Sequence, residues 1–378
     1  MEKTFINKLA KFRRELHRNP EVSQNEFQTK KRILFFLKEI GVSETIEVGN
    51  TGLICVFDSG VEGKTVLIRG DIDALPIQEI NTFAHRSTVE GVSHKCGHDG
   101  HAAILCGLAK RLIKEPLKSG RALLLFQPAE ENGEGAKAVI HDPHFVFKPD
   151  FVFALHNLPG YPLHQVVYKE GSFTAAAKSI ILKLDGRTSH AAEPELGINP
   201  AAGISKLISM FQEVSNPDLS TSNFALATPI HIHMGELSYG ISAGSAEVHY
   251  TLRTWNNEMM NQFSEVISRK ALVICEEEKL KLTIDWTQEF SANQNHTDTT
   301  EYIVKAIEEN KLSGSVRPYP FKWGEDFGLF TEKYKGAMFG IGSGEQCPAL
   351  HNPDYDFPDA LLTTGINMFY SILKSTVK

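Results

Sequence analysis

The chain has 378 residues, of which 42% are hydrophobic and 22% are charged, values typical of a globular protein with two or more domains. This composition argues against disorder, a collagen helix or a long coiled coil. The formal net charge is −7, from 39 basic and 46 acidic residues, so we expect neither nucleic acid nor an anionic membrane surface as a partner.

The cysteines and the N-terminal segment indicate a cellular location. The five cysteines are an odd number without the spacing of a disulfide framework, which predicts reduced thiols and a cytoplasmic protein. Charged residues interrupt the start of the chain, and no apolar run approaches the roughly 18 residues of a membrane span. We therefore expect neither secretion nor membrane insertion.

In chain order, the first predicted elements are two helices. They cover the opening segment and residues 25–40, and the second ends at Gly41. Short runs that are apolar throughout then alternate with helical patterns, which favours a mixed, mostly parallel sheet covered by helices on both faces. The predicted strands are 53–57, 65–68, 122–126, 151–155 and 337–341, and the predicted helices are 99–114, 301–310 and 359–373.

The middle of the chain follows a different order of elements. Between about residues 177 and 288 the order is β-α-β-β-α-β, which matches the ferredoxin-like unit. Such a unit closes its own sheet, so we expect an inserted domain at 178–287 and a discontinuous main domain at 1–177 and 288–378. The elements of the insert are expected at 179–184, 199–214, 224–234, 246–254, 258–276 and 281–286.

Potential metal ligands follow the predicted strands of the main domain. In an open α/β sheet the ligand crevice lies at the carboxyl ends of the strands. Thiolate, imidazole and carboxylate together favour zinc or another late first-row divalent metal over magnesium or calcium. The candidate ligands are Cys96, His98, Glu131, His156 and His351.

Five ligands exceed the three protein groups of one catalytic metal, which predicts two metals with Cys96 as the simplest bridge. Neighbours on an extended segment point to opposite sides, so Glu131 is expected to bind metal while Glu130 faces the substrate as the general base. That base would take a proton from metal-bound water and pass it to the leaving nitrogen. Asp71 and Asp73 share a face, and one of them is expected to hold a ligand histidine.

Other histidines and cysteines are assigned structural roles. The segment at 141–144 is typical of a surface loop. His231 and His233 alternate on one strand of the insert and are expected to pack or to line an interface. Cys55 and Cys106 are expected to be core residues.

Six segments, taken in order, resemble those of a known family. They are residues 67–76, 94–101, 126–131, 189–194, 324–327 and 350–351. The most specific are Cys96-Gly97-His98-Asp99-Gly100-His101 and Pro128-Ala129-Glu130-Glu131. Over nearly its whole length the chain resembles the metal-dependent amidohydrolases related to aminoacylase and carboxypeptidase G. Its branch resembles hippurate hydrolases, N-acetyldiaminopimelate deacetylases and hydrolases of indoleacetyl-amino-acid conjugates.

This resemblance implies a zinc-peptidase-like catalytic domain and an inserted lid that mediates homodimer formation. It implies the five ligands above for a binuclear centre, Glu130 as general base and Asp73 as the carboxylate that supports the metals. His190 resembles a lid histidine that reaches the partner's site and stabilises the tetrahedral oxyanion. Arg253 matches a lid-strand arginine that contacts either a substrate carboxylate or the dimer interface.

The lid departs from the family pattern at two places. Gly240-Ile241-Ser242-Ala243 stands where relatives carry Asn-Val-Ile-Pro, so one amide expected near the substrate is missing. Glu195 stands where many relatives have histidine, which suggests a different side-chain preference. We expect either the substrate orientation or the lid geometry to differ from the usual one.

The predicted activity is hydrolysis of the amide of a small N-acyl amino acid or related conjugate, through a metal-bound hydroxide. Zinc, manganese, cobalt and nickel all suit the ligand set. The first alternative is a dipeptidase or aminopeptidase, which would use the same metals but anchor a free amino terminus. The second, a non-catalytic binding protein on this scaffold, is less favoured because every ligand and the base are present.

Overall fold

The computed structural model describes residues 2–377 and divides the chain into two compact units. Unit 1 runs to Phe173, continues over Asn293–Pro318 and resumes at Glu325. Unit 2 consists of Thr174–Ala292 and Tyr319–Gly324, so it extends a few residues beyond the predicted insert at both ends. The added segment joins unit 2 through a β-bridge between Thr174 and Phe321.

Unit 1 is built around a mixed eight-stranded sheet in the order β1-β2-β4-β3-β5-β16-β6-β15. The central strands β4, β3, β5 and β16 are parallel, and antiparallel pairs occur at β1-β2, β2-β4 and β16-β6. The strands are β1 (Thr45–Val48), β2 (Gly52–Asp58), β3 (Thr65–Asp71), β4 (Arg121–Gln127), β5 (Phe151–Pro159), β6 (Val166–Tyr168), β15 (Gly314–Val316) and β16 (Lys335–Gly344). A separate short pair joins β7 (Gly171–Ser172) to β14 (Gln294–Asn295).

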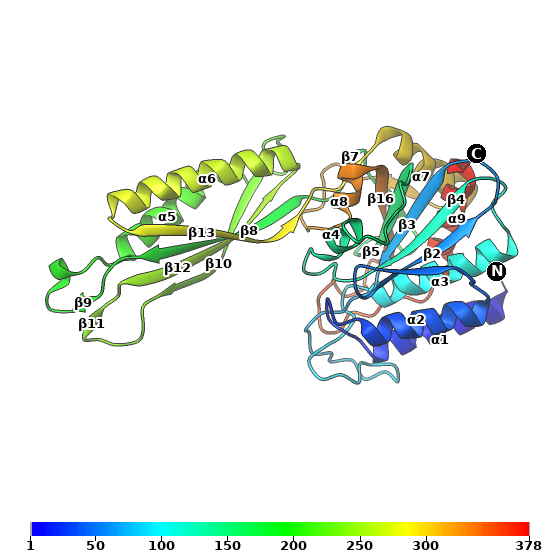
Figure 1. The fold of residues 1–378 in the computed structure, drawn as a ribbon, viewed down its shortest axis with the longest axis horizontal. Coiled ribbons are helices and arrows are strands. Elements are labelled where there is room, and N and C mark those ends of the chain that lie inside the picture. Colours follow the sequence, from blue (N-terminus) through cyan, green and yellow to red (C-terminus); the bar gives the residue numbers. More distant parts are fainter. Residues whose placement is uncertain (1, 378) are drawn as a thin grey trace. The chain divides into compact units, whose positions relative to one another are not determined.

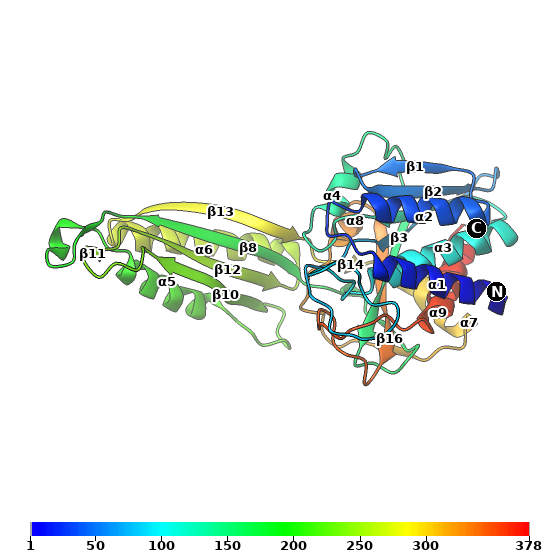
Figure 2. The ribbon, with the colours of Figure 1, turned by 90° about the horizontal axis from the view of Figure 1, so that it is seen from below.

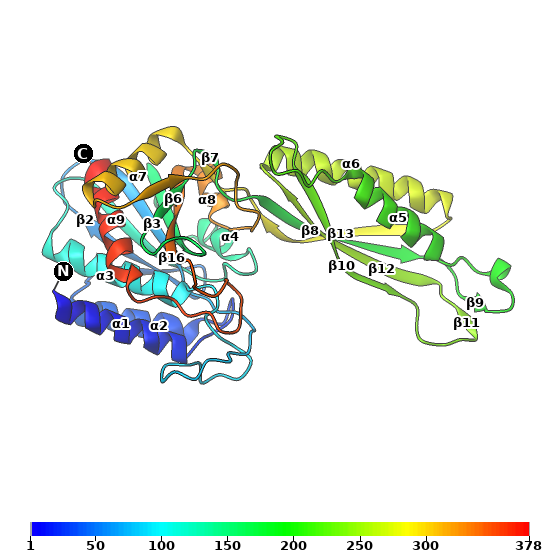
Figure 3. The same cartoon turned by 180° about the vertical axis from the view of Figure 1, so that it is seen from behind.

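Helices cover both faces of this sheet. On one face α3 (His98–Lys114), α9 (Leu361–Thr376) and α7 (Thr297–Glu309) lie side by side (Figure 3). Against α3 pack α1 (Lys3–Arg18) and α2 (Phe27–Ile40). The short helices α4 (Gly135–Ile140) and α8 (Gly328–Lys333) lie on the other face (Figure 1). The predicted end of α2 is confirmed, because Gly41 adopts a φ of 98° and its N–H caps the last turn.

Unit 2 has the β-α-β-β-α-β order read from the sequence. Its antiparallel sheet has the strand order β10-β12-β8-β13 (Figure 2). Both helices lie on one face of that sheet (Figure 1). Its elements are β8 (Ala176–Asp185), α5 (Ala201–Val214), β10 (Ala225–Met234), β12 (Ser245–Thr254), α6 (Asn257–Glu277) and β13 (Lys281–Phe290). A short ladder pairs β9 (Ser189–His190) with β11 (Ile241–Ser242), and a 3-10 turn η1 covers Pro194–Leu196.

The predicted α/β fold class is therefore confirmed. Apolar strands are buried in the centre of unit 1, as in Leu123, Leu124 and Leu125 of β4, which are fully buried. In β12 of unit 2, buried side chains alternate with more exposed ones, as expected for a sheet with helices on one face. Among the helices within residues 2–377, none is long and apolar enough to cross a membrane.

A buried network of charges joins α1 to α3 behind the loops of the sheet edge. The Arg13 side chain is 1% exposed, and its Nη1 lies 3.3 Å from Asp99 Oδ2 and 2.6 Å from Asp356 Oδ1. One turn later, the two ring nitrogens of His17 contact Asp99 and Glu79. Burial alone would lower the pKa of His17, but these hydrogen bonds outweigh it and raise the pKa to about 9.

We expect Arg13→Met to destabilise unit 1 strongly, because it removes one of the two cations that face the buried Asp99 and the cation between Asp356 and Asp359. The free energy of unfolding in urea, measured on metal-free protein, should fall by about 3–5 kcal/mol. Arg14→Met is the matched control, since the Arg14 side chain is 49% exposed and pairs with Asp359 at the surface. It should cost less than about 1 kcal/mol. Equal losses for the two variants would contradict this account of the network.

Candidate metal centre

Unit 1 brings the residues at its strand ends together at one edge of the sheet. Asp71 is the last residue of β3, and the pair Glu130 and Glu131 follows β4. Strand β5 continues to Pro159, so His156 lies on the strand and not after it as predicted. Because β3, β4 and β5 are parallel, these side chains converge at the same edge.

Cys96 and His98 enter the site on either side of a glycine. Gly97 has a φ of 98°, in the left-handed region, and α3 begins at His98 directly after it. A Cβ on Gly97 would lie 2.6 Å from the side chain of Asn157, so a larger residue does not fit. The sharp turn places Cys96 Sγ 3.4 Å from Nε2 of His156.

The ring of His98 is oriented by Asp73. Its Nδ1 lies 3.1 Å from Asp73 Oδ1 and 3.0 Å from the Asp73 carbonyl oxygen, so Nδ1 carries a proton and donates it to Asp73. The other ring nitrogen, Nε2, is therefore the one that can bind a metal cation. Within residues 2–377, His98 Nε2 has no hydrogen-bond partner although it is buried. Burial would lower the pKa of His98, but Asp71 and Asp73 raise it to about 10. The imidazole therefore lies in a field that favours positive charge.

The candidate ligand atoms form two groups that share Cys96. One group is Cys96, His98 and His156, the other is Cys96, Glu131 and His351, and the ligand atoms of each lie within 4.8 Å of one another. The His351 N–H donates to the Lys95 carbonyl at 2.8 Å. That hydrogen bond brings His351 next to Cys96.

Three properties of these groups suit metal binding. Glu131 Oε1 is buried and has no hydrogen-bond partner among the described residues. Burial and nearby carboxylates raise the pKa of the Cys96 thiol well above its usual value, so the thiolate needs a neighbouring cation. Thiolate, imidazole and carboxylate are the donors that late first-row metals prefer. The residues therefore fit two divalent cations with one shared ligand.

Glu130 and Glu131 lie in a turn, so the predicted extended backbone at this pair is wrong. The turn begins after Ala129, which has a φ of 53°. Both glutamates place an oxygen within 4.8 Å of a nitrogen of His98 and of each other, so they are not on opposite sides. Their other neighbours differ, since Glu130 Oε1 accepts from the Asp326 N–H at 3.4 Å whereas Glu131 faces Cys96.

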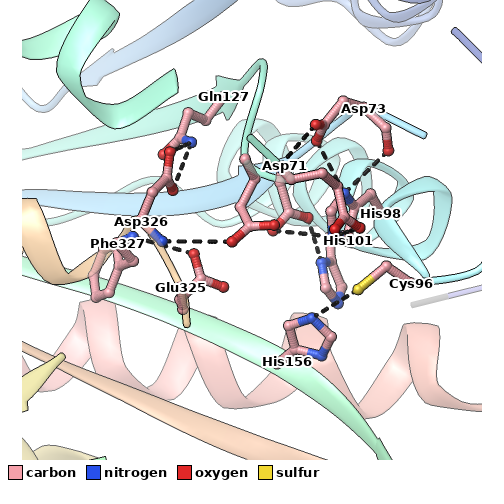
Figure 4. A network of polar contacts seen from close by, with 12 residues as sticks. Asp71, Asp73, Cys96, His98, His101, Gln127, His156, Glu325, Asp326 and Phe327 are labelled. Carbon is pink, nitrogen blue, oxygen red and sulfur yellow. Dashed lines mark hydrogen bonds and ion pairs between the residues drawn. The ribbon is translucent and has the colours of Figure 1, made fainter. Parts of the chain in front are cut away.

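A buried arginine organises a second network that the sequence did not reveal. Figure 4 labels four of its partners, Asp71, Gln127, Glu325 and Asp326. Arg69 on β3 is 1% exposed and donates to Gln127 Oε1 (2.9 Å), Asp71 Oδ2 (2.6 Å), Glu325 Oε1 (2.8 Å) and Asp326 Oδ1 (2.7 Å). The sequence did offer one sign of this network, an arginine directly following an apolar stretch of β3. A buried arginine needs several hydrogen-bond acceptors.

His101 is a further residue of the site that the ligand prediction omitted. It lies three residues after His98 on α3, the spacing that places two side chains on one face of a helix. Its Nδ1 lies 2.5 Å from Asp71 Oδ1 and its Nε2 lies 2.6 Å from Asn157 Oδ1. Both ring nitrogens are thus hydrogen-bonded, so neither is available to bind a metal. His101 therefore supports the site by orienting Asp71 and Asn157.

The two remaining predicted site residues, His190 and Arg253, lie in unit 2. His190 is exposed on β9, and the Ala192 N–H donates to its Nδ1 at 3.0 Å, so the proton of the neutral ring is on Nε2. Arg253 on β12 donates through Nη1 to the Lys322 carbonyl at 2.6 Å.

Gly240, where the family resemblance leads us to expect an asparagine, contacts the His190 segment through its backbone. The Gly240 carbonyl accepts from the Ala191 N–H at 3.0 Å. Apart from its two chain neighbours, no described residue has a heavy atom within 4 Å of the position that a Cβ on Gly240 would take. A larger side chain therefore has room here.

Known proteins resemble this chain over almost its full length. The model of peptidase family M20/M25/M40 matches residues 67–375. Hippurate hydrolase of Campylobacter jejuni is 30% identical over 371 residues, covering 97% of this chain and 96% of the relative. N-acetyl-L-cysteine deacetylase of Bacillus subtilis is 32% identical over 375 residues, covering 98% of this chain and 88% of the relative.

A solved structure agrees with these relatives. A dinuclear metal-binding peptidase of the M20 family from Bacillus subtilis is 28% identical, with a TM-score of 0.85 and complete coverage of both chains. The resemblance drawn from the sequence motifs is therefore confirmed. This chain belongs to peptidase family M20/M25/M40.

Proposed function

We propose that this protein is a metal-dependent amidohydrolase that removes the acyl group from an N-acyl amino acid or a small related conjugate. The observation that carries the proposal is the pair of candidate ligand groups that share Cys96, with the buried carboxylate of Glu130 beside them. The names of the two curated relatives, a hippurate hydrolase and an N-acetyl-L-cysteine deacetylase, support the substrate class.

The proposed metal ligands are those of the two groups. Two divalent cations bound there would acidify a water molecule and polarise the amide carbonyl. Zinc, manganese, cobalt and nickel suit this donor set. Asp73 would keep His98 in the tautomer that binds metal through Nε2. The ligands are Cys96, His98, Glu131, His156 and His351.

Glu130 is the proposed general base. Burial raises the pKa of Glu130 well above its usual value, and the charges of Glu325 and Glu131 add to this effect. A carboxylate with a raised pKa accepts a proton from the attacking water more readily and then returns it to the leaving nitrogen. The Asp326 N–H and the Arg69 network restrict the position of this carboxylate.

His190 is the proposed donor to the oxyanion, supplied by the second copy of a homodimer. The hydrogen bond from Ala192 to Nδ1 leaves a proton on Nε2, which suits donation to a developing negative charge.

Arg253 is proposed to contact a substrate carboxylate or the dimer interface. Five free cysteines support the proposed cytoplasmic location.

A substrate panel tests the activity. The protein is reconstituted separately with zinc, manganese and cobalt. We expect it to release free amine from at least one class among N-acetyl, N-benzoyl, N-succinyl and indoleacetyl amino acids, and not from unblocked dipeptides.

Glu130→Gln should reduce kcat by about 10²–10⁴-fold with metal content unchanged. Glu134→Gln is the matched control, because Glu134 is exposed in the same loop.

Two outcomes would contradict this assignment. Cleavage of dipeptides alone would identify a peptidase with a subsite for a free amine. If none of these substrates is cleaved although two metals are bound per chain, the proposed reaction is contradicted.

Metal stoichiometry tests the shared ligand. Cys96→Ala should reduce the content from two metals per chain to less than one, because both proposed sites lose a ligand. His156→Ala and His351→Ala should each lose one metal, measured by elemental analysis after dialysis against a metal buffer. His144→Ala, with a 71% exposed side chain in a surface loop, should retain both. Full occupancy in the Cys96 variant would rule out the proposed bridge.

The lid histidine is tested by mixing two inactive variants. His190→Ala should lower kcat by about 10²–10³-fold with little change in KM. When it is mixed with Glu130→Gln and the subunits exchange, part of the activity should return, because one site of the mixed dimer has both groups. If no activity returns although mixed dimers form, His190 does not act across the interface.

A further inference from the structure

Glu26, which directly precedes α2, is a buried acid that the proposed mechanism does not use. It is 0% exposed. Its Oε1 accepts from the Ala129 N–H at 2.8 Å, and its Oε2 accepts from the Thr51 hydroxyl at 2.6 Å. Burial raises its pKa above the ordinary value. One carboxyl group therefore joins the start of α2, the β1-β2 connection and the loop after β4.

The residue that Glu26 holds has an unfavourable backbone conformation. Ala129 has a φ of 53°, in the left-handed region, where a non-glycine residue costs about 1–2 kcal/mol. Ala129 immediately precedes Glu130 and Glu131. A change of its backbone angles would therefore redirect both carboxylates.

The turn borders a cavity on one side. A cavity of about 520 Å³ is lined by Thr51, Pro128 and Ala129, among other residues. Ala129 itself is buried, and its hydrogen bond to Glu26 helps to hold the strained backbone beside this cavity.

The amides on both sides of Glu130 are held in the same way. The Ala129 N–H donates to the buried Glu26, and the Glu131 N–H donates to the buried Asp73 at 3.0 Å. Asp73 Oδ2 also accepts from the Ser23 hydroxyl at 2.8 Å. Two buried carboxylates thus restrain the backbone of the turn before and after Glu130.

We propose that Glu26 is a positioning residue, which fixes the left-handed turn at Ala129 and thereby the direction of Glu130 and Glu131. Its effect passes through the Ala129 N–H. The proposal rests on the proposed function, in which Glu130 is the general base and Glu131 binds metal.

Three variants separate positioning from general stability. Glu26→Ala removes the acceptor and should lower kcat by about 10–10²-fold with KM within about twofold of wild type. Glu26→Gln retains a carbonyl that can accept from Ala129 N–H and should restore most of kcat. Thr51→Val removes the second hydrogen bond of Glu26 but leaves the one to Ala129, so its kcat should stay within about threefold of wild type.

A second readout does not depend on turnover. In cobalt-loaded protein without substrate, the visible absorption spectrum reports the geometry of the ligands, including Glu131. The spectrum should change in Glu26→Ala and match wild type in Glu26→Gln and Thr51→Val. If Glu26→Ala does not fold, Glu26→Asp, which keeps the charge but shortens the reach to Ala129, replaces it in both measurements.

The outcomes also separate this proposal from the proposed function. Unchanged kcat and an unchanged cobalt spectrum in Glu26→Ala would overturn the positioning role. So would a Glu26→Gln variant as slow as Glu26→Ala, or an equal loss in Thr51→Val. If wild type itself cleaves none of the substrates, the proposed function fails, whereas the cobalt spectra still decide whether Glu26 sets the turn.

Discussion

Buried negative charge at the carboxyl edge of the unit 1 sheet is the constraint on which the site depends. Burying a carboxylate is costly unless a positive charge or hydrogen-bond donors compensate it. Arg69 contacts three of these acids at once, His101 pairs with one of the same three, Asp71, and His98 faces Asp73. The negative charge that these cations leave uncompensated, together with the Cys96 thiolate, suits the binding of metal cations. The acids are Asp71, Asp73, Glu130, Glu131, Glu325 and Asp326.

The two ways of compensating charge explain why different roles are proposed for the adjacent glutamates. Glu131 lies among Cys96, His98 and His351, where bound cations would lower its proton affinity. Glu130 instead accepts from the Asp326 N–H, beside acids that Arg69 only partly neutralises. The same turn therefore presents one carboxylate suited to ligation and one suited to proton transfer.

The sequence predicted those features that local pattern determines. Strands buried on both faces are continuous apolar runs, so β2, β3, β4, β5 and β16 were recognisable. The rule for strand ends led to the edge of the sheet at which the candidate ligands lie, although His156 lies on β5 itself. The strands β6 and β15 were missed because three residues are too few to show the alternation of apolar and polar side chains that marks a strand. The partners of Arg69 and the inclusion of Tyr319–Gly324 in unit 2 arise from contacts between distant segments, which spacing does not encode. The turn at Glu130 was misread because Ala129 is a non-glycine residue in a left-handed conformation.

Part of the support for the site comes from a segment of the chain that contributes none of the proposed ligands. Among the residues before β3, His17 contacts Asp99, Ser23 contacts Asp73 and Glu26 contacts Ala129. Each of these contacts ends on a residue that adjoins or orients a proposed ligand or the base. A catalytic group held within a fraction of an ångström needs such a supporting layer, because the loops at a sheet edge have few neighbours of their own. The N-terminal segment therefore does more than pack against α3: α1 and the connection before α2 hold the loops in which the chemistry is proposed to occur.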